Sequence, residues 1–384
     1  MKTRAKIRVL GVMTGTSCDG MDAACLEISQ SGWKALWAAK VGYPASLRAR
    51  VLSAQKPAAQ FTSLEWLKLN RDLGDWYATS ISTMIRNSSP KPDLIANHGQ
   101  TLAHFPAAEN AGMTMQLGDP SRIAFATGIT TVSNFRDGDM AAGGEGAPLV
   151  PLFHSLLAHV LDPKKQGIAI HNIGGISNLT YVSPQGDVLA FDTGPGNIWI
   201  DAAAEKVTEG RRKMDLGGKL AAQGRVDWAA VTSLLKHPYF KRSAPKSTGR
   251  DEFPSELFFS KLKNREASPV ATATALTIES IAQAYEQFVL KKKHPLKSIF
   301  FCGGGAKNGV LMEALAERLN FVEVRKLEDY GLNPELIEAQ AFAYFGYLAL
   351  NGVALGGKWT GAQGFAPPAH IIPGKNWRKL IQSL

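Results

Sequence analysis

Cysteine is scarce in this sequence, and long apolar runs are missing. The 384 residues include three cysteines, which are too few and too scattered for a disulfide framework or a zinc ribbon. No stretch approaches the ~20 apolar residues that a membrane helix needs. The basic N-terminus also lacks the apolar core of a signal peptide. We therefore expect a cytoplasmic protein that has no membrane partner.

The signatures of several enzyme classes are missing as well. The sequence contains no Walker A loop, no Rossmann fingerprint and no Gly-x-Ser-x-Gly elbow. His98 and His104 stand six residues apart, and His154 and His159 five apart, so neither pair can chelate one ion locally. These gaps argue against a serine hydrolase and against a metal-dependent hydrolase.

What the sequence does have is glycine and positive charge. It contains 37 glycines, and 43 basic against 33 acidic residues give a formal net charge of +10. The basic runs at 211–213 and 291–293 lack interleaved aromatic residues, which indicates solvated surface rather than a nucleic-acid site. We therefore expect small anionic ligands and no nucleic-acid partner.

Strand-like and helix-like segments alternate along the chain, which predicts an α/β fold. The first half opens on a hairpin with strands at 7–11 and 21–28, and a similar glycine-turned hairpin begins at residue 168. This repetition indicates a duplicated fold, with the main domain boundary within 145–167. A Pro-rich, basic segment at 236–255 predicts a long loop of functional or disordered character. Helices are predicted at 62–85, 274–290, 307–319 and 334–350, the last of them buried.

Two similar turns could bind phosphate. The turn at Gly11–Gly20 places Gly, Thr and Ser between two strands, where successive N–H groups can form an anion nest. Asp19 and Asp22 could hold Mg²⁺ directly or through water. An ordinary hairpin turn explains the same residues equally well. A second such turn at 172–178 favours a nucleotide polyphosphate held by two related turns.

Two further glycine-rich bends follow predicted strands. Asp192 precedes the bend 193–197, where α/β sheets place ligands, and it is a candidate general base. A helix cap or an Asx-turn is the alternative for this residue. The glycines 303–305 lead into a predicted helix, where a flat ligand can lie against the backbone. A tight strand–helix turn is the alternative there.

Polar residues in the first half indicate a sugar or carboxylate ligand. His98, within 97–101, could hydrogen-bond a polyol, although turn formation and core polar satisfaction explain it equally well. Arg136 could clamp a carboxylate through two parallel hydrogen bonds. The alternative for Arg136 is a surface ion pair with Asp137 or Asp139.

Together these segments resemble one family, anhydro-N-acetylmuramic acid kinase, over nearly the whole chain. The family consists of bacterial sugar kinases of the actin-like ATPase superfamily. The resemblance therefore implies two actin-like (ribonuclease H-like) domains with a cleft that closes on substrate. The segments that carry it include GVMTGTSCDGMDAA at 11–24, NHGQTLAHFP at 97–106, MQLGDPSRIA at 115–124, NIGGISNLTYV at 172–182, FDTGPGN at 191–197, KSTGRDEF at 246–253 and FCGGGAKN at 301–308.

The resemblance also implies a domain plan. Residues 1–150 are expected to form the N-terminal domain, with the first phosphate hairpin and the sugar-site loops. Residues 345–384 are expected to pack back on that domain. Residues 151–345 are expected to form the C-terminal domain, with the second phosphate hairpin, the catalytic Asp and the adenosine-site glycines. A homodimer is expected from the family.

The family's reaction supplies the expected ligands and roles. Its members cleave the 1,6-anhydro ring of anhydro-N-acetylmuramic acid with water and phosphorylate the freed 6-hydroxyl, using ATP and Mg²⁺. The product is N-acetylmuramic acid 6-phosphate, in the recycling of cell-wall peptidoglycan. By resemblance, Asp192 is the base. The nucleotide is expected to contact Gly15, Thr16, Ser17, Cys18, Asp19, Gly20, Met21, Asp22, Gly174, Gly175, Gly303, Gly304 and Gly305. The sugar is expected to contact Asn97, His98, Gln100, Thr101, Asp119, Arg136, Gly194 and Asn197.

The sequence departs from the family pattern at one position, and two other functions remain as alternatives. The family commonly has Asp where this chain has Asn134, so no charge-dependent role is carried over to that position. A kinase of the same fold for a different sugar is the nearest alternative. A nucleotide-gated binding module would need an attached domain, which is not expected because about 20 residues follow the turn at 359–364.

Overall fold

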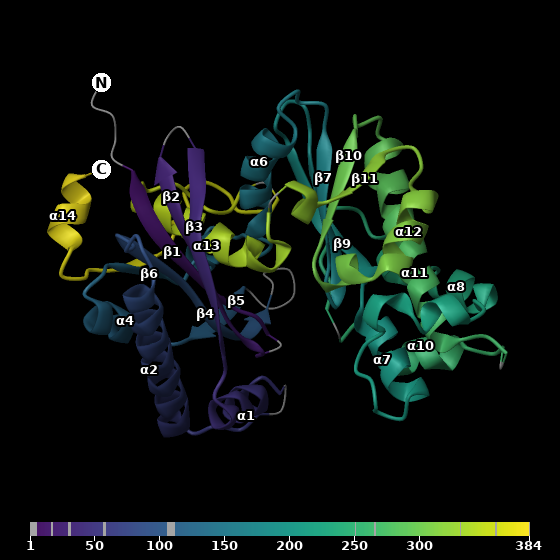
Figure 1. The fold of residues 1–384 in the computed structure, drawn as a ribbon, viewed down its shortest axis with the longest axis horizontal. Helices are drawn as coiled ribbons and strands as arrows, with labels where there is room; N and C mark the ends of the chain where they lie inside the picture. Colours follow the sequence, from purple (N-terminus) through teal and green to yellow (C-terminus); the bar gives the residue numbers. More distant parts are fainter. Residues whose placement is uncertain are drawn as a thin grey trace. The chain divides into compact units, whose positions relative to one another are not determined.

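The computed structural model describes most of the 384 residues and divides them into two compact units (Figure 1). Unit 1 comprises Met1–Phe153 and Leu336–Leu384, and unit 2 comprises His154–Glu335. The division falls within helix α6 (Val150–Leu161). The described residues are 6–16, 18–29, 32–56, 59–105, 112–249, 251–264, 266–330, 332–357 and 359–383.

Unit 1 is built on a seven-stranded sheet. Its main path runs β12-β6-β4-β1-β2-β3, and β5 pairs with β4. Strand β1 is antiparallel to β2, with which it forms the opening hairpin. On its other side β1 is parallel to β4. The strands are β1 (Ile7–Thr14), β2 (Gly20–Ser29), β3 (Gly32–Gly42), β4 (Leu94–Phe105), β5 (Met113–Leu117), β6 (Thr131–Ser133) and β12 (His370–Ile372).

Unit 2 repeats this order in a five-stranded sheet, β11-β10-β7-β8-β9. Strands β7, β8 and β9 form an antiparallel meander, and β10 is parallel to β7 and β11. The order and directions match β6-β4-β1-β2-β3 of unit 1, so the predicted duplicated α/β fold is confirmed. The strands are β7 (Ile168–Ile173), β8 (Ile176–Val182), β9 (Val188–Pro195), β10 (Ser298–Cys302) and β11 (Glu323–Lys326).

Helix α2 (Ser63–Asn87) covers one face of the unit 1 sheet. It begins in a capping box between Thr62 and Glu65, and its buried stripe includes Leu73 and Ile81. This stripe packs with Val12 of β1 in one apolar cluster. The other helices of this unit are α1 (Ala45–Ala54), α4 (Pro120–Thr127), α5 (Asp137–Ala141), α13 (Ile337–Leu350) and α14 (Trp377–Gln382). Within the described residues, no helix is long and apolar enough to cross a membrane.

Helix α13 lies on the opposite face of this sheet, directly against β1. It is buried on most of its sides, as its apolar sequence predicts. A Cβ atom at Gly11 would lie 2.0 Å from the carbonyl oxygen of Ala339 and 2.3 Å from the amide nitrogen of Ala343. Only a residue without a side chain allows the helix to approach the strand this closely.

Gly11→Ala is therefore expected to lower the free energy of unfolding by about 2–3 kcal/mol, because an overpacked backbone contact must shift. Urea unfolding followed by circular dichroism measures the change. Gly42→Ala is the matched control, since nothing lies within 4 Å of its Cβ position and its φ is not positive. Equal stability of the two variants would contradict the close approach.

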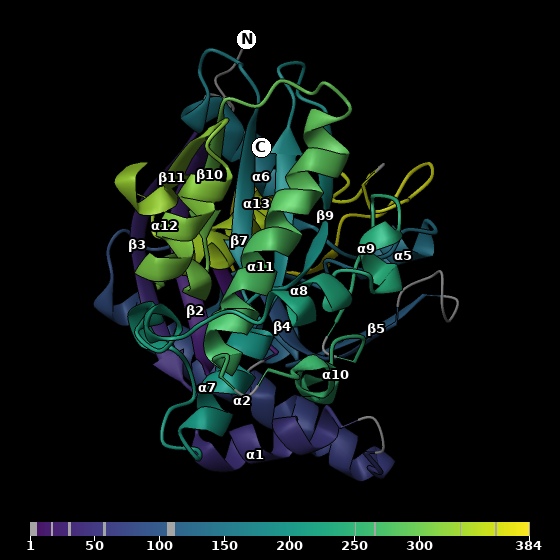
Figure 2. The same cartoon turned by 90° about the vertical axis from the view of Figure 1, so that its right-hand side faces the viewer.

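Helix α11 (Pro269–Tyr285) runs along one face of the unit 2 sheet (Figure 2). Its Ile281 and Tyr285 pack with strand residues such as Leu179 and Phe301 in one buried cluster. The sheet core is thus covered by a helix that the apolar periodicity predicts. The remaining helices of the unit are α7 (Ile198–Val207), α8 (Trp228–Leu234), α9 (Pro238–Lys241), α10 (Ser255–Lys261) and α12 (Gly309–Arg318).

The loop predicted at 236–255 is mostly loop in the described residues, interrupted by the short helix α9 (Pro238–Lys241). Residues 238–249 and 251–253, hereafter the strap, begin with this helix and pack closely on unit 2. Tyr239, Phe240 and Phe253 of the strap are buried beside Trp199 of α7. Burial of these rings holds the strap on unit 2 in spite of its proline and basic residues, because each large ring removes apolar surface from water when it is buried.

Candidate active site

Asp192 lies near the C-terminal end of β9 and is held by three hydrogen bonds from the strap. Its amide N–H donates to the carbonyl of Lys246 at 2.9 Å, and the Tyr239 hydroxyl donates to its own carbonyl at 2.6 Å. The amide N–H of Thr248 donates to carboxylate Oδ2 at 2.9 Å. No partner for Oδ1 occurs in the described part of the chain. The carboxylate is therefore fixed through one oxygen and can act through the other.

The surroundings of Asp192 tune its charge. Burial raises the pKa of the carboxyl to about 6, while the Thr248 N–H and the Lys246 charge act in the opposite direction. The group is thus ionised at neutral pH yet basic enough to accept a proton. A pKa close to the working pH is what general-base catalysis requires.

Two glycine turns of unit 2 meet beside this strand. The amide N–H of Asn197 donates to the carbonyl of Gly174 at 2.7 Å, and that of Gly196 donates to Gly175 at 2.9 Å. The Asn197 side chain donates from Nδ2 to the carbonyl of Ile173 at 3.1 Å. Gly174, Gly175 and Asn197, which the sequence predicts as ligand contacts, therefore lie together. The side-chain amide of Asn197, which was predicted to contact the sugar, therefore supports the neighbouring glycine turn.

The third glycine turn, 303–305, packs on the same place. Gly303 has φ 83°, and a Cβ there would lie 2.4 Å from Asn172 Oδ1 and 2.8 Å from the carbonyl oxygen of Ile173. Both the dihedral angle and the contact require glycine. Gly194 lies two residues after Asp192 on β9. The structure thus brings the predicted unit 2 residues into one neighbourhood, at the ends of β7, β9 and β10.

An apolar hollow of about 440 Å³ opens in unit 2 where α12 follows the third glycine turn. Val310 of α12, Ile278 of α11 and Trp228 of α8 line it. The Trp228 side chain is exposed in spite of its apolar character. Such a hollow suits a flat, largely apolar group.

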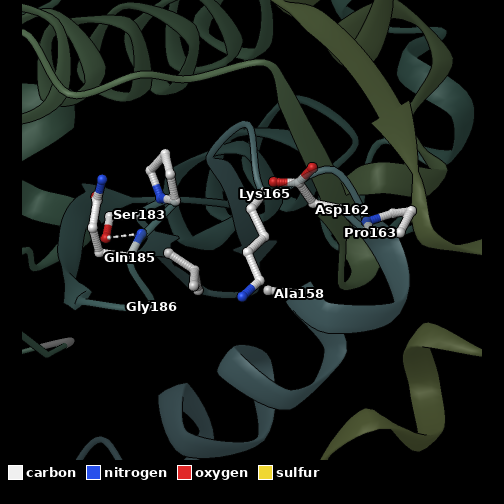
Figure 3. Close-up of a pocket in the computed structure, with 9 residues that line it drawn as sticks. Ala158, Asp162, Pro163, Lys165, Ser183, Gln185 and Gly186 are labelled. Carbon is white, nitrogen blue, oxygen red and sulfur yellow. Dashed lines mark hydrogen bonds between the residues drawn. The ribbon is translucent and has the colours of Figure 1, made fainter.

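A smaller hollow of about 90 Å³ lies between the α6–β7 loop and the β8–β9 turn (Figure 3). Its polar groups are used within their own loops. Ser183 Oγ accepts hydrogen bonds from the amides of Gln185 and Asp187, and Asp162 Oδ2 accepts from those of Gln166 and Gly167. These contacts explain Ser183 and Asp162 as groups that hold their own loops together.

In unit 1, the turn that joins β1 and β2 is held from outside. Gln100 Nε2 donates to the carbonyl of Gly15 at 3.2 Å, and Arg48 Nε donates to that of Cys18 at 2.8 Å. The Tyr43 hydroxyl orients the Gln100 amide through a 2.6 Å hydrogen bond. Gln100, predicted to contact sugar, therefore supports the turn. Gly15, Thr16 and Gly20 shape the turn, the Met21 side chain belongs to the core, and Ser17 lies outside the described residues.

Asp19 and Asp22 each face a basic side chain. Asp19 Oδ1 lies 3.7 Å from Arg48 Nη2, and Asp22 Oδ1 lies 3.3 Å from Lys40 Nζ. Among the described residues, no group of three His, Cys, Asp or Glu side chains could hold a metal ion. One carboxylate in the turn and one at the start of β2 nevertheless fit Mg²⁺, which usually binds through one or two carboxylates together with substrate phosphates. The donors fit an ion that arrives with a nucleotide rather than a resident metal.

Arg136 is oriented by two partners. Its Nε donates to His98 Nε2 at 3.1 Å, and its Nη1 donates to the carbonyl of Gly146 at 2.9 Å. Burial and the Arg136 charge lower the pKa of His98 to about 3, so the imidazole is neutral and carries its proton on Nδ1, facing the carbonyl of Gly99 at 2.8 Å. Nη2 of Arg136 has no partner within the described ranges. The guanidinium is thus fixed on one side and has N–H groups left for an anion, although the negative charge of Glu338 on α13 also acts on it.

The expected alternative for Arg136, an ion pair with a neighbouring carboxylate, does not form. Asp137 accepts a hydrogen bond from Asn134 Nδ2 at 2.9 Å. Asp139 is buried and accepts from the Gly146 amide at 2.8 Å and from the Thr360 hydroxyl at 2.6 Å. Asp139 therefore holds the loop whose carbonyl orients Arg136.

The other predicted sugar contacts of unit 1 occupy different surroundings. Asn97 is buried on β4, and its Oδ1 has no hydrogen-bond partner. Thr101 accepts a hydrogen bond from Gln116 Nε2 at 3.4 Å. Asp119 caps α4 through the amide of Ser121 at 2.9 Å. The structure brings His98 and Arg136 together but gives Asp119 a local helix-capping contact.

Sequence reasoning missed the residues that hold Asp192. Lys246 and Thr248 stand in the segment KSTGRDEF, which carries the family resemblance but predicts no role for either residue. Thr248 acts through its backbone N–H, which has no sequence signature. Lys246 and Tyr239 could have been suspected from the unusual combination of aromatic and basic residues in a supposed loop.

The family model and the curated relatives that this chain matches name the same family. The model of the family "Anhydro-N-acetylmuramic acid kinase" matches residues 7–368. The anhydro-N-acetylmuramic acid kinase of Acidithiobacillus ferrooxidans is 38% identical over 391 aligned residues, covering 98% of this chain and 95% of that protein. The one of Gloeobacter violaceus is 39% identical over 362 residues, covering 89% and 92%. A hexokinase from Schistosoma mansoni complexed with glucose is similar in structure, with 8% identity, coverage of 89% and 86%, and a TM-score of 0.42.

Proposed function

Because the chain belongs to the anhydro-N-acetylmuramic acid kinase family, a family of carbohydrate kinases, we propose that it opens the 1,6-anhydro ring of anhydro-N-acetylmuramic acid and phosphorylates O6. The observation that carries this proposal is Asp192, a carboxylate near pKa 6 that is fixed through one oxygen and free at the other. The product would be N-acetylmuramic acid 6-phosphate.

Asp192 acts as the base in this proposal. It takes a proton from a water molecule as that water attacks the anomeric carbon. The bond from the anomeric carbon to O6 breaks, and O6 attacks the γ-phosphorus of ATP while the bond to ADP breaks. Such a transfer depends on positioning and on stabilising the charge of the phosphoryl group.

The glycine turns at 174–175 and 303–305 of unit 2 would bind nucleotide phosphates through backbone amides. The family resemblance adds residues 15–22 of unit 1 as expected nucleotide contacts. The apolar hollow beside Trp228 and Val310 suits the adenine base. Asp19 and Asp22 would hold Mg²⁺ directly or through water, and the bound ion would neutralise phosphate charge.

The sugar would be recognised by polar side chains of unit 1. Arg136, held by His98 and Gly146, offers its free side to the lactyl carboxylate of a muramic acid. Asn97 has a buried oxygen without a partner, which a sugar hydroxyl could satisfy. A kinase for a neutral sugar would not need the arginine, which favours the muramic acid over a different sugar. We further propose a cytoplasmic homodimer, as is expected of the family.

An isotope experiment tests the coupled reaction. The protein is incubated with ATP, Mg²⁺ and anhydro-N-acetylmuramic acid in ¹⁸O-labelled water. We expect phosphate on O6 and one ¹⁸O atom at the anomeric position, both measured by mass spectrometry. Phosphorylation without ring opening, or ring opening without transfer, would contradict the proposed function.

A further inference from the structure

Asp192, Lys246 and Tyr239 form a closed ring of hydrogen bonds. The Asp192 amide donates to the Lys246 carbonyl at 2.9 Å, and Lys246 Nζ donates to the Tyr239 carbonyl at 3.1 Å. The Tyr239 hydroxyl closes the ring by donating to the Asp192 carbonyl at 2.6 Å. Each residue therefore fixes the next, and a cationic side chain is built into the support of the base.

The Lys246 ammonium has a defined position. It lies 4.5 Å from the centre of the Tyr239 ring and 5.0 Å from that of the Phe288 ring. Cation–π contacts of this kind hold a charge without neutralising it. Burial lowers the pKa of Lys246 to about 8, so the group remains a cation at neutral pH.

The other charged strap residues near Lys246 largely compensate one another. Arg242 binds both oxygens of Glu252, at 3.2 and 2.6 Å, and Glu252 also accepts a hydrogen bond from the Thr248 hydroxyl at 2.8 Å. Lys246 is the cation whose charge acts on Asp192.

The remaining elements against β9 bring no competing charge to Asp192. Strand β8 places the neutral Asn178 opposite it. On α11, Glu279 is paired with Arg318 at 3.1 Å, and the Tyr285 hydroxyl faces His171 at 3.0 Å. Among the described residues, the Lys246 charge thus acts on Asp192 without a competing charge from these elements.

We propose that Lys246 is a positioning residue for the base: its ammonium, fixed over two aromatic rings, keeps the Asp192 carboxylate ionised, while its main chain holds the strap to β9. This inference rests on the proposed function, because it assigns a task to Lys246 only if Asp192 is the base. It concerns the charge of Lys246, not contact with substrate.

Lys246→Gln tests the charge, since glutamine keeps an amide donor but carries no charge. We expect the acid limb of the kcat/KM profile, near pH 6 in the wild type, to move up by roughly half a unit to one unit. The limb moves to higher pH because removing the cation raises the pKa of Asp192, and the base is active only when it is ionised. Activity at pH 6 should fall about two- to six-fold, because the ionised fraction of the base falls by that factor, while activity at pH 8 should recover. An unmoved acid limb would overturn the proposal.

Two variants separate charge from local structure. Lys246→Arg retains the cation and should keep the acid limb of the wild type. Lys241→Gln removes an exposed charge from the same strap and should change nothing. A shift of equal size in Lys241→Gln would indicate a general effect of net charge and would count against Lys246. Absence of activity in the wild type would instead refute the proposed function itself.

A reciprocal measurement avoids any substitution of Lys246. If the Lys246 charge lowers the pKa of Asp192, the Asp192 charge must raise that of Lys246 by the same linkage. The pH dependence of Lys246 acylation, followed by peptide mass spectrometry, should therefore move to lower pH in Asp192→Asn. Identical profiles in the wild type and the variant would overturn the proposal.

Discussion

Asp192→Asn is expected to lower the rate of phosphorylation at least about 10³-fold while the protein folds normally, in keeping with the usual size of general-base catalysis. Asparagine can still accept the hydrogen bond from the Thr248 amide, so the strap should remain in place. It cannot take a proton from water, so the attack on the anomeric carbon should fail. Coupled measurement of ADP release and sugar phosphate gives the rate.

The matched control for this variant is Asp187→Asn. Asp187 is exposed in the turn that leads into β9, and its substitution removes the same charge from the same hairpin. We expect the control to turn over like the wild type. Circular dichroism and thermal unfolding of both variants separate loss of chemistry from loss of folding. Turnover of Asp192→Asn close to that of the wild type would refute the assignment of the base.

Much of the fold could be predicted because periodic apolar patterns are local properties of the sequence. Helix α2 (Ser63–Asn87) lies close to its predicted range, and the unit 2 hairpin begins at residue 168 as predicted. Strand β3 (Gly32–Gly42) was not predicted. It is an edge strand with most residues partly or fully exposed, so burial imposes little alternation on its sequence.

The glycine-rich turns of the candidate site could be found from the sequence for a physical reason. Where two backbone segments pack closely, as at Gly303 against Ile173, no side chain fits, so the sequence must have glycine there. The same requirement that marks a ligand turn also marks tight packing, however. Asn197 shows the same ambiguity, because its side chain was predicted to contact a ligand and is seen to support the turn beside it.

The supports of the site could not be predicted, because they use groups that every residue has. Thr248 contacts Asp192 through its amide, and Gly146 orients Arg136 through its carbonyl. Gln100 and Asp119 show the converse. Their polar side chains predict ligand contacts, and the structure gives them a second task that the sequence did not indicate, to hold a turn and to cap a helix. Which partner a polar group takes is decided by the tertiary fold.

Arg136→Ala is expected to raise KM for anhydro-N-acetylmuramic acid by about 100-fold, the effect of losing a charge-assisted bidentate contact of about 2–3 kcal/mol. The same variant should change KM for the glucosamine analogue, which lacks the lactyl carboxylate, by only a few-fold. The comparison isolates recognition of the carboxylate, because both sugars share the anhydro ring that is opened. Steady-state kinetics with each sugar measures the two effects.

Two further variants bear on the arginine. Arg136→Lys keeps the charge but loses the planar fork that binds His98 and Gly146, so we expect an intermediate KM. Arg71→Ala removes an exposed arginine from α2 of the same unit and should leave both sugars unaffected. Because Arg136→Ala also strips His98 and Gly146 of a donor, its thermal unfolding must be compared with that of the wild type. An equal rise in KM for both sugars would show that Arg136 supports the site without recognising the carboxylate.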